Sequence, residues 1–457
     1  MAENQLVALE AFLKDHPTIG FTPPSHPEFA SLCKICNASY RDVPLAIVHP
    51  HSPEDVSTLI KYVQSTGLKF TIRTGGHNME GRAIVEEALV IDMRALTSVQ
   101  VAADRQSATV QGGILQGDLG KKLWQEGVVT PTGSIPSVGY VGWAMYGGYG
   151  AFSSRWGLGV DQILGATVVN PDGEIVKADE ALLKGIRGAG GVFGVIVDMT
   201  IKVYPVKSLL AGIIMYDSQD ISKTMAEFNA GYQKLLKEGI PSQLTLQQLA
   251  FNAPPGRIFG ATMVWSDDDL EEGQRWIQKI ANLSTPIMNT VAPTTIPEWF
   301  DGNAALVPET MYGTTRTLNL YEITPEIAAI FGRYVQQMPS NPGAMFSMHG
   351  LRGPSAFPRD NSVFGTREPH FLIEILGFST EEESAKESQQ WAARFVDEIR
   401  KEASGNILPT AYISIYHTKD EPKPLKDFYG LHAEEVEALK EKFDPENVFS
   451  LSFPQVK

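Results

Sequence analysis

The sequence predicts an α+β protein with two domains, one rich in glycine and one built around an antiparallel sheet. Two observations carry this prediction. Within residues 44–78 a strand, a helix, a second strand and a glycine loop follow one another, and residues 207–410 alternate apolar strands with long amphipathic helices. Strands that alternate with helices on one side of the sheet are typical of an α+β layer.

The first domain opens with a strand–helix–strand unit. Its helix is the clearest element, because Ser52 is a good N-cap, Pro53 suits the first helical position and Gly67 can end the helix. Strands precede and follow it at residues 44–51 and 69–73, and the second strand leads directly into the glycine loop.

The remaining elements follow from alternation, turn residues and helical spacing. In the first domain these signals predict strands within residues 88–111, a helix at 117–127, a hairpin at 163–178 with its turn at 171–173, and a long strand at 191–206. In the second they predict strands at 209–217, 243–251 and 257–266 and helices at 269–283 and 382–403. A strand at 412–417 and a helix at 434–449 are predicted last, so that the chain divides into residues 1–206, 207–410 and 411–457.

Charge and hydropathy exclude several kinds of partner. The 457 residues include 53 acidic and 38 basic side chains, a net charge of −15, which would repel a phosphate backbone and disfavours nucleic-acid binding. The uncharged run at residues 127–154 contains two prolines and many glycines, which predicts irregular backbone and no membrane contact. The N-terminus has acidic residues where a signal peptide needs basic ones, so the expected location is the cytoplasm.

Cys33 and Cys36 form a C-x-x-C pair and are the only cysteines. A zinc site would need further ligands at close spacing, and a thioredoxin-like site would need a βαβ context, neither of which is visible. We therefore expect no metal site and two small apolar side chains one helical turn apart, with a reactive dithiol as the alternative.

Several common catalytic motifs are absent or incomplete. Residues 117–122 contain a Gly-Lys pair but lack the first glycine and the final Ser or Thr of a phosphate loop. Residues 188–194 have the spacing G-x-G-x-x-x-G and precede a strand, unlike a dinucleotide fingerprint. There is no G-x-S-x-G or H-E-x-x-H. The missing motifs therefore argue against a hydrolase, a metalloprotease or an NAD dehydrogenase.

Two glycine segments remain as candidates for a ligand site. In the loop at residues 73–78, two adjacent glycines after a strand can present successive N–H groups to a pyrophosphate. His77 follows them with a nitrogen that can accept a proton, bind a metal or bond to an electrophilic carbon. The second segment, residues 136–150, is uncharged and aromatic and is either a set of tight core turns or, with the first, the cradle of a flat and partly anionic cofactor.

Five segments, in this order, resemble the berberine-bridge-enzyme-like branch of the vanillyl-alcohol-oxidase flavoproteins, and among these the 6-hydroxynicotine-oxidase type. They are TIRTGGHNMEG, PSVGYVGWAMYGGYG, WGLGVDQILGATVVNPDGEIV, IRGAGGVFGVIVDMTIKVYP and KEKFDPENVF. The resemblance implies a two-domain vanillyl-alcohol-oxidase/PCMH-type fold. In it, residues 1–206 and 411–457 would form the FAD-binding domain, and the antiparallel sheet of residues 207–410 would cover the isoalloxazine.

The resemblance also implies how FAD is held. In the family, the histidine of R-x-G-G-H is bonded to the flavin 8α-methyl group, and His77 matches it. The other implied cofactor-binding positions are Arg73, Thr74, Gly75, Gly76, Asn78, Val138, Gly139, Gly142, Gly147, Gly148, Gly150, Val195 and Asn447.

The sequence departs from the family pattern in informative places. Many members add a cysteinyl bond from a C-P-x-V-G motif, but Ile135 stands at the cysteine position here and no cysteine follows Cys36. A single histidyl bond is therefore the most that can be expected. His432 replaces a frequent asparagine and Lys184 a usual tryptophan, which changes local details of the flavin site and not the fold.

The residue that takes up the substrate proton is less clearly marked. In plant members a glutamate lies eight residues before the Phe of F-P-H-R, whereas this chain has FPR at residues 357–359 and His349 eight positions earlier. A histidine could accept a hydroxyl or amine proton as hydride leaves, and a plain polar histidine is the alternative. Tyr412, Tyr416 and His417 are competing candidates on the predicted strand.

These features predict an FAD-dependent oxidase. It would remove a hydride from a C–H next to an OH or NH of a small, largely apolar metabolite and use dioxygen as electron acceptor. Trp143 and Tyr149 are candidates for lining the pocket or for core packing. A flavoprotein cyclase of secondary metabolism, oxidative or redox-neutral, and a non-catalytic flavin-fold binding protein remain as alternatives.

Overall fold

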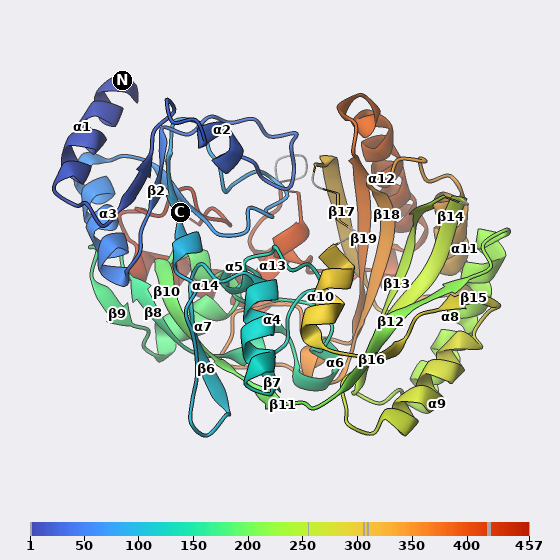
Figure 1. Ribbon diagram of the computed structural model, residues 1–457. Coiled ribbons are helices and arrows are strands. Elements are labelled where there is room, and N and C mark those ends of the chain that lie inside the picture. The colour runs from blue at the N-terminus through green and yellow to red at the C-terminus, as the bar shows by residue number, and fades with distance from the viewer. Residues whose placement is uncertain (1, 255, 305–306, 309, 418–421, 457) are drawn as a thin grey trace.

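The computed structural model describes residues 2–254, 256–304, 307–308, 310–417 and 422–456. Figure 1 shows two parts side by side, of which the first holds three small sheets and both chain ends, and the second holds one eight-stranded sheet. No helix within these ranges combines the length and the apolar character needed to cross a bilayer.

The first part contains a four-stranded sheet in the order β1-β2-β4-β3 and a five-stranded antiparallel sheet in the order β5-β6-β10-β8-β9. A short two-stranded sheet pairs β11 with β7. The elements are α1 (Ala2–Lys14), β1 (Gly20–Thr22), α2 (Phe29–Leu32), β2 (Ala46–His49), α3 (Pro53–Thr66), β3 (Phe70–Arg73), β4 (Leu89–Asp92), β5 (Val99–Val101), β6 (Ser107–Gln111), α4 (Gln116–Gln125), β7 (Val128–Val129), α5 (Tyr140–Ala144), α6 (Ser153–Trp156), η2 (Gly159–Gln162), β8 (Ile163–Val169), β9 (Ile175–Lys177), α7 (Glu180–Ala189), β10 (Val195–Lys202) and β11 (Tyr204–Pro205).

Helix α3 forms as its sequence predicts. The Ser52 hydroxyl accepts a hydrogen bond of 3.1 Å from the backbone N–H of Asp55, Pro53 occupies the first helical turn, and Gly67 ends the helix in the left-handed conformation with φ +66°. Strand β3 begins three residues later and carries the chain to the glycine loop. The local signals therefore place this loop at the carboxyl end of a buried strand.

The second part is built on one antiparallel sheet in the order β15-β12-β14-β13-β18-β19-β17, with β16 paired to β12. Its elements are β12 (Leu209–Tyr216), α8 (Ile221–Glu238), β13 (Leu244–Ala253), β14 (Gly256–Trp265), α9 (Leu270–Ala281), β15 (Pro286–Asn289), β16 (Ala292–Thr294), α10 (Ile296–Ala304), β17 (Tyr312–Leu320), α11 (Pro325–Gln336), β18 (Ala344–Leu351), η4 (Gly353–Ala356), β19 (His370–Ser379) and α12 (Glu382–Glu402). The mixed helix and sheet content and the antiparallel sheet confirm the predicted fold class.

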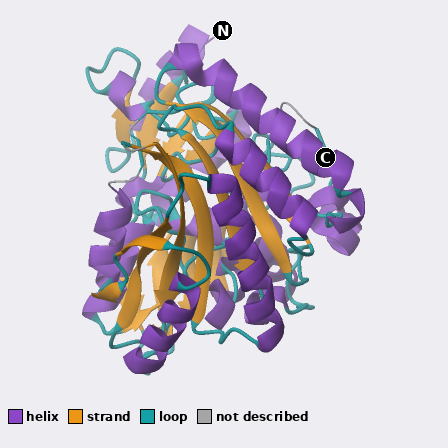
Figure 2. Ribbon diagram, turned by 90° about the vertical axis from the view of Figure 1, so that its right-hand side faces the viewer, coloured by secondary structure: helices purple, strands orange, loops and turns teal. Residues whose placement is uncertain are grey.

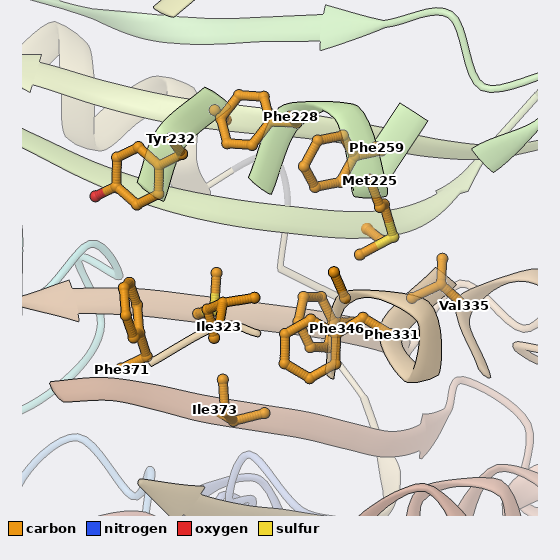
Figure 3. Close-up of a cluster of buried hydrophobic side chains, with 14 of the residues drawn as sticks. Met225, Phe228, Tyr232, Phe259, Ile323, Phe331, Val335, Phe346, Phe371 and Ile373 are labelled. Atoms are coloured by element: carbon orange, nitrogen blue, oxygen red, sulfur yellow. The ribbon is translucent and has the colours of Figure 1, made fainter. Parts of the chain in front are cut away.

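The long helices α8, α9, α11 and α12 lie together over one face of this sheet, as the turned view of Figure 2 shows. Apolar side chains from the sheet and from α8 and α11 meet there in the core drawn in Figure 3, which includes Phe228, Phe259, Phe331 and Phe346. Strand residues alternate between the two faces, so the positions between the core residues face the first part of the molecule.

The chain returns to the first part after α12. This segment contains η6 (Ile413–Ile415), α13 (Lys426–Tyr429) and α14 (Ala433–Phe443). The Phe449 ring packs at 5.7 Å and nearly edge-on against Phe70 of β3, and the Tyr146 hydroxyl hydrogen-bonds the backbone oxygen of Phe453. Segments from both ends of the chain thus share one core.

The predicted strand at residues 412–417 is wrong. The chain forms the 3₁₀ turn η6 there, because Ile413 and Tyr416 both enter the hydrophobic core. A spacing of three residues lies on one side of a 3₁₀ turn, whereas in a strand it would lie on opposite faces.

Candidate active site

A cavity of about 590 Å³ is lined by the two glycine segments of the first part and by the uncovered face of the large sheet. Its wall includes Thr74, Gly75, Gly76, His77, Asn78, Val138, Gly139, Gly142, Gly150, Val195 and His349, all of them among the predicted site residues. Residues of the C-terminal segment, such as Phe449 and Phe453, also line it. Ligand pockets commonly have volumes of about 300–1,000 Å³.

The first glycine loop packs directly against the second glycine segment. A Cβ atom on Gly75 would collide with the backbone oxygen of Ser137, and Gly76 has a left-handed φ of +68°. Glycine is therefore required at both positions for the loop to keep this path. The His77 Nε2 atom lies 2.8 Å from the Ser137 hydroxyl oxygen, which links the two segments through their side chains as well.

His77 is a neutral base on the cavity wall at physiological pH. Burial lowers its pKa from 6.5 to about 4, because the charged imidazolium would lose water there. An uncharged imidazole keeps one nitrogen lone pair available. The side chain can therefore act as a nitrogen nucleophile toward a group bound in the cavity.

Three glycines of the second segment have different surroundings. A Cβ atom on Gly142, in the short helix α5, would meet no heavy atom within 4 Å and would enter open cavity space. Gly147 and Gly148 lie off the described cavity wall, and a Cβ on either would strike packed neighbours, including the Tyr412 ring and Gly159. Gly142 therefore leaves space for a ligand, whereas Gly147 and Gly148 permit close packing behind the cavity wall.

Polar groups in and beside the cavity fit a large polar cofactor such as FAD. Gln116 is fully buried on the cavity wall, and neither its amide nitrogen nor its amide oxygen has a hydrogen-bond partner within the described part of the chain. Buried polar atoms are normally paired, so a ligand with donors and acceptors would complete this site. The free space at Gly142 and the neutral His77 supply the shape and the nucleophile that the predicted attachment requires.

Arg73 and Asn447 lie outside the described cavity wall. The guanidinium of Arg73 is 4% exposed, donates 2.7 Å to the backbone oxygen of Lys34, and has its pKa lowered to about 10 by burial. Asn447 has a left-handed φ of +53° in the turn after α14. That turn is held by the Asp444 carboxylate, which accepts from the backbone N–H of Phe449, a residue of the cavity wall.

On the opposite wall the sheet contributes an ionisable pair. The Nε2 atom of His349 on β18 lies 3.3 Å from Oε2 of Glu374 on β19, and both line the cavity. Burial raises the pKa of Glu374, but the nearby His349 and a hydrogen bond from Ser347 outweigh it and leave the pKa below its usual value. Sequence reasoning missed Glu374, although it is the one charged residue in the apolar strand HFLIEILGF, which is a signal that could have revealed it.

The structure separates the three other candidates for the proton acceptor. Tyr412 lines the cavity, its hydroxyl oxygen accepts 3.2 Å from the Gly148 N–H, and burial raises its pKa to about 12. Tyr416 is buried in the core, and His417 lies 2.9 Å from the Tyr40 hydroxyl and 3.9 Å from the Glu80 carboxylate. Neither Tyr416 nor His417 belongs to the described cavity wall, so their positions do not support a catalytic role.

Trp143 and Tyr149 serve both of the roles expected for them. Each lines the cavity and each also packs in the interior, Tyr149 at 4.3 Å and edge-on to the Tyr412 ring. The Tyr149 hydroxyl lies 3.4 Å from Nε2 of the buried His370, whose pKa burial lowers to about 4.

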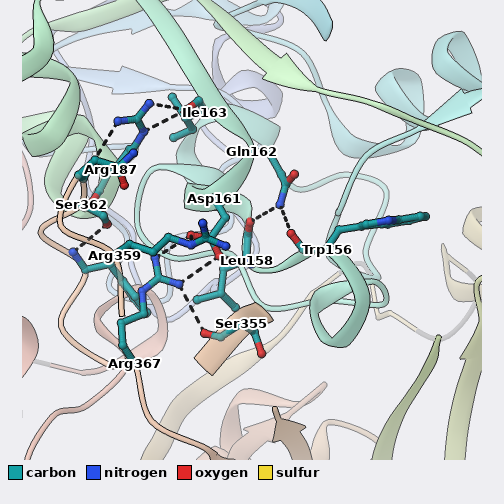
Figure 4. A network of polar contacts seen from close by, with 12 residues as sticks. Trp156, Leu158, Asp161, Gln162, Ile163, Arg187, Ser355, Arg359, Ser362 and Arg367 are labelled. Carbon is teal, nitrogen blue, oxygen red and sulfur yellow. Dashed lines mark hydrogen bonds and ion pairs between the residues drawn. The ribbon is translucent and has the colours of Figure 1, made fainter. Parts of the chain in front are cut away.

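A buried carboxylate ties the loop between β18 and β19 to the first part of the molecule (Figure 4). Asp161 of η2 forms ion pairs of 2.8 Å with both Arg359 and Arg367 and accepts 2.8 Å from the Leu158 N–H. Arg187 donates to the backbone oxygen of Ile163 beside them. Because this loop joins the strands that carry His349 and Glu374, the network ties the connection between these two strands to the first part of the molecule.

The C-x-x-C segment packs behind the first glycine loop. The backbone N–H of Cys36 donates 3.0 Å to the oxygen of Gly76, and burial raises the pKa of the Cys36 thiol to about 11. Both thiols are free and half-buried. A raised pKa disfavours the reactive thiolate, which supports the packing role over the reactive dithiol.

Comparison with known proteins identifies the family. A family profile described as an FAD binding domain matches residues 44–179. An FAD-linked oxidoreductase of Gibberella zeae is 31% identical over 429 residues, which cover 93% of this chain and 83% of that protein.

Two solved structures share the fold over nearly the whole chain. The structure of 6-hydroxy-D-nicotine oxidase from Arthrobacter nicotinovorans has a TM-score of 0.84 at 21% identity, with 95% of this chain and 97% of that one covered. Berberine bridge enzyme from Eschscholzia californica has a TM-score of 0.83 at 18% identity, with 98% of each chain covered.

The glycine cradle, the profile match and the relative from Gibberella zeae agree, and the chain therefore belongs to the FAD-linked oxidoreductases with the berberine-bridge-enzyme-like, PCMH-type FAD-binding fold.

Proposed function

We propose that the protein is an oxidase that removes a hydride from a C–H next to an OH or NH of a small, largely apolar metabolite, with dioxygen as the electron acceptor. One observation carries the proposal: the His349–Glu374 pair faces the same cavity as the glycine cradle. A proton acceptor and a flavin site on opposite walls are the two groups that oxidation of an alcohol or amine requires.

Bound FAD would supply the redox chemistry, because it accepts a hydride and then passes two electrons and a proton on to dioxygen, which also takes up the substrate proton and leaves as hydrogen peroxide. The protein would supply orientation and proton transfer. Glu374, ionised and hydrogen-bonded to His349, would take the hydroxyl or amine proton as the hydride leaves. The pair, rather than His349 alone, is therefore our proposed acceptor.

The cofactor is proposed to be attached through His77 alone. His77 is neutral on the cavity wall, as a nitrogen nucleophile must be. Ile135 also lines the cavity and offers no thiol where other members carry the cysteine of a second bond. Residues 1–206 and 411–457 would form the FAD-binding domain, and residues 207–410 the substrate domain.

The substrate half of the cavity suits an apolar molecule with one OH or NH group. Leu249, Met345 and Leu376 line it from the sheet, and Trp299 from helix α10. The polar groups between them would bind the single OH or NH. The two free thiols agree with the cytoplasm as the proposed place of action.

An anaerobic screen tests the proposal. The yellow holoprotein is mixed with a panel of phenols, benzylic alcohols and cyclic amines while the flavin absorbance is recorded, and air is then admitted. We expect bleaching by a substrate, recovery in air and one hydrogen peroxide per turnover. Turnover without peroxide would favour the cyclase, and binding without any bleaching across the panel would favour a non-catalytic protein.

A further inference from the structure

The sheet face toward the cavity carries a polar patch formed by Gln247, Ser347, His349 and Glu374. These residues come from the three neighbouring strands β13, β18 and β19. In the register of the sheet Gln247 lies opposite His349, and Ser347 lies opposite Glu374. Residues paired in this way point to the same face, so the sheet itself brings the four side chains together.

Within the patch the hydrogen-bond donors point toward Glu374. The Gln247 amide Nε2 donates 2.8 Å to the Ser347 hydroxyl oxygen, and Ser347 is 1% exposed. An amide nitrogen can only donate, so the serine proton remains for another acceptor. That acceptor is the Glu374 carboxylate, because Glu374 lies directly opposite Ser347 in the sheet register and the Ser347 hydroxyl is among the groups that lower its pKa. Donors therefore run from Gln247 through Ser347 to Glu374, and His349 approaches the same carboxylate from the neighbouring strand.

The cavity wall around the patch carries few positively charged side chains. Among the described residues on the cavity wall, Arg82 is the only lysine or arginine. It lies against the Phe453 ring of the C-terminal segment and forms a 2.6 Å ion pair with Glu80. The titratable groups that face Glu374 are His349 from β18 and Tyr412 from the segment before η6. An organic anion bound at the patch would thus meet the Glu374 carboxylate with His349 already paired to it, and no lysine or arginine from the described wall beside it.

We propose that Ser347 and Gln247 are positioning residues that hold Glu374 as an ionised proton acceptor, so that the site selects neutral or cationic substrates bearing an O–H or N–H donor and rejects organic anions. This inference rests on the proposed function, because it concerns the same acceptor. A hydrogen bond from a neutral donor stabilises a carboxylate more than a carboxylic acid. Loss of Ser347 should therefore make Glu374 easier to protonate.

The first test measures the protonation of Glu374 without any substrate. The holoprotein is titrated with acid, and the carboxylic-acid C=O band is followed by infrared difference spectroscopy and assigned by its loss in Glu374→Gln. In Ser347→Ala we expect the pKa of Glu374 to rise by about one unit. Ser347→Thr keeps the hydroxyl and should restore the wild-type value.

Two further variants separate positioning from general damage to the sheet. Gln247→Leu keeps the volume but removes the donor to Ser347, and should raise the pKa in the same direction by a smaller amount. Ser266, directly after β14, is also fully buried, but its hydroxyl donates to the backbone oxygen of Gln243. Ser266→Ala should leave the pKa of Glu374 unchanged. An unchanged pKa in Ser347→Ala, or an equal rise in Ser266→Ala, would overturn the relay.

The second test measures selection between a donor and an anion of similar shape. 1-Naphthol and 1-naphthoate are titrated into the holoprotein and binding is read from the perturbed flavin absorbance. We expect naphthol to bind at least about ten-fold more tightly, and Glu374→Gln to tighten naphthoate by a similar factor. The selectivity claim is refuted if wild type binds naphthol no better than naphthoate.

The two proposals can fail separately. If Glu374→Gln reduces its flavin with substrate as fast as wild type does, the acceptor assigned under the proposed function is wrong, whatever the infrared titration shows. If Glu374→Gln is slow but Ser347→Ala leaves the pKa of Glu374 unchanged, the acceptor stands and the positioning role fails.

Discussion

Replacing Gly142 with leucine should separate folding from FAD binding. The helix α5 places this residue on the cavity wall, and a Cβ atom there would meet no heavy atom within 4 Å. The Cβ atom therefore costs no packing in the FAD-free protein, and we expect the rest of the side chain to extend into the cavity. Leucine is also a better helix former than glycine, which gives a gain of up to about 1 kcal/mol.

Cofactor binding should change in the opposite direction. The leucine side chain would project into the space that the cofactor needs, and overfilling of a packed site costs about 1–3 kcal/mol. That energy corresponds to an affinity for FAD about 5- to 150-fold lower. We expect an unchanged or slightly higher thermal midpoint of the FAD-free protein, together with a lower ratio of flavin to protein absorbance after reconstitution.

Gly302 offers a matched control. It lies in helix α10, a Cβ there would also meet nothing within 4 Å, and it is not part of the described cavity wall. Gly302→Leu should therefore keep full FAD content. The reasoning is refuted if Gly142→Leu takes up as much FAD, with the same affinity, as Gly302→Leu does.

Four further predictions concern other groups. His77→Ala should release its FAD on acid denaturation whereas wild type retains it, and free flavin from wild type would contradict a covalent bond. Glu374→Gln should slow anaerobic flavin reduction by about two to four orders of magnitude. Because the pKa of Glu374 is lowered, the wild-type rate should decline only as the pH falls below the usual glutamate value of about 4.3, and a decline near neutral pH would argue against this acceptor. Burial lowers the pKa of His370 to about 4, so its contribution to stability is present above about pH 6.5 and is lost as the pH falls toward 4. In His370→Gln the thermal midpoint should therefore depend less on pH over that range. An unaltered pH dependence would count against the lowered pKa. Asp161→Ala leaves two arginines without their carboxylate and should lower the free energy of unfolding by about 3–5 kcal/mol and expose the loop at residues 352–369 to protease. Asp267→Ala breaks a more exposed ion pair and should lower it by at most about 1 kcal/mol. Equal losses of stability would disprove the special role of the buried network.

Local signals predicted the first domain well because its elements begin and end at residues with strong preferences. Ser52 and Gly67 bound α3 in the structure as they do in the sequence. The turn at residues 171–173 closes the β8–β9 hairpin with Gly173 at φ +72°. Such residues act within a few positions of themselves, so no knowledge of the rest of the chain is needed.

The predictions from the sequence failed where contacts between distant segments determine the local structure. The segment at residues 412–417 alternates like a strand, but Ile413 and Tyr416 find their core partners only when η6 turns them to one side. Likewise the partner of His349 comes from the next strand of the sheet, and only its register places Glu374 beside it. Sequence spacing within one strand could not indicate which neighbour would lie alongside.

The shared core of the two chain ends has a consequence for biosynthesis. Phe449 and Phe453 line the cavity but are translated after the whole substrate sheet. A nascent chain on the ribosome can fold its early strands as they emerge, yet the cleft stays open on one side until these last aromatic residues have left the exit tunnel. We therefore expect flavin to load only after translation, and a chain that stops before Phe449 should stay colourless.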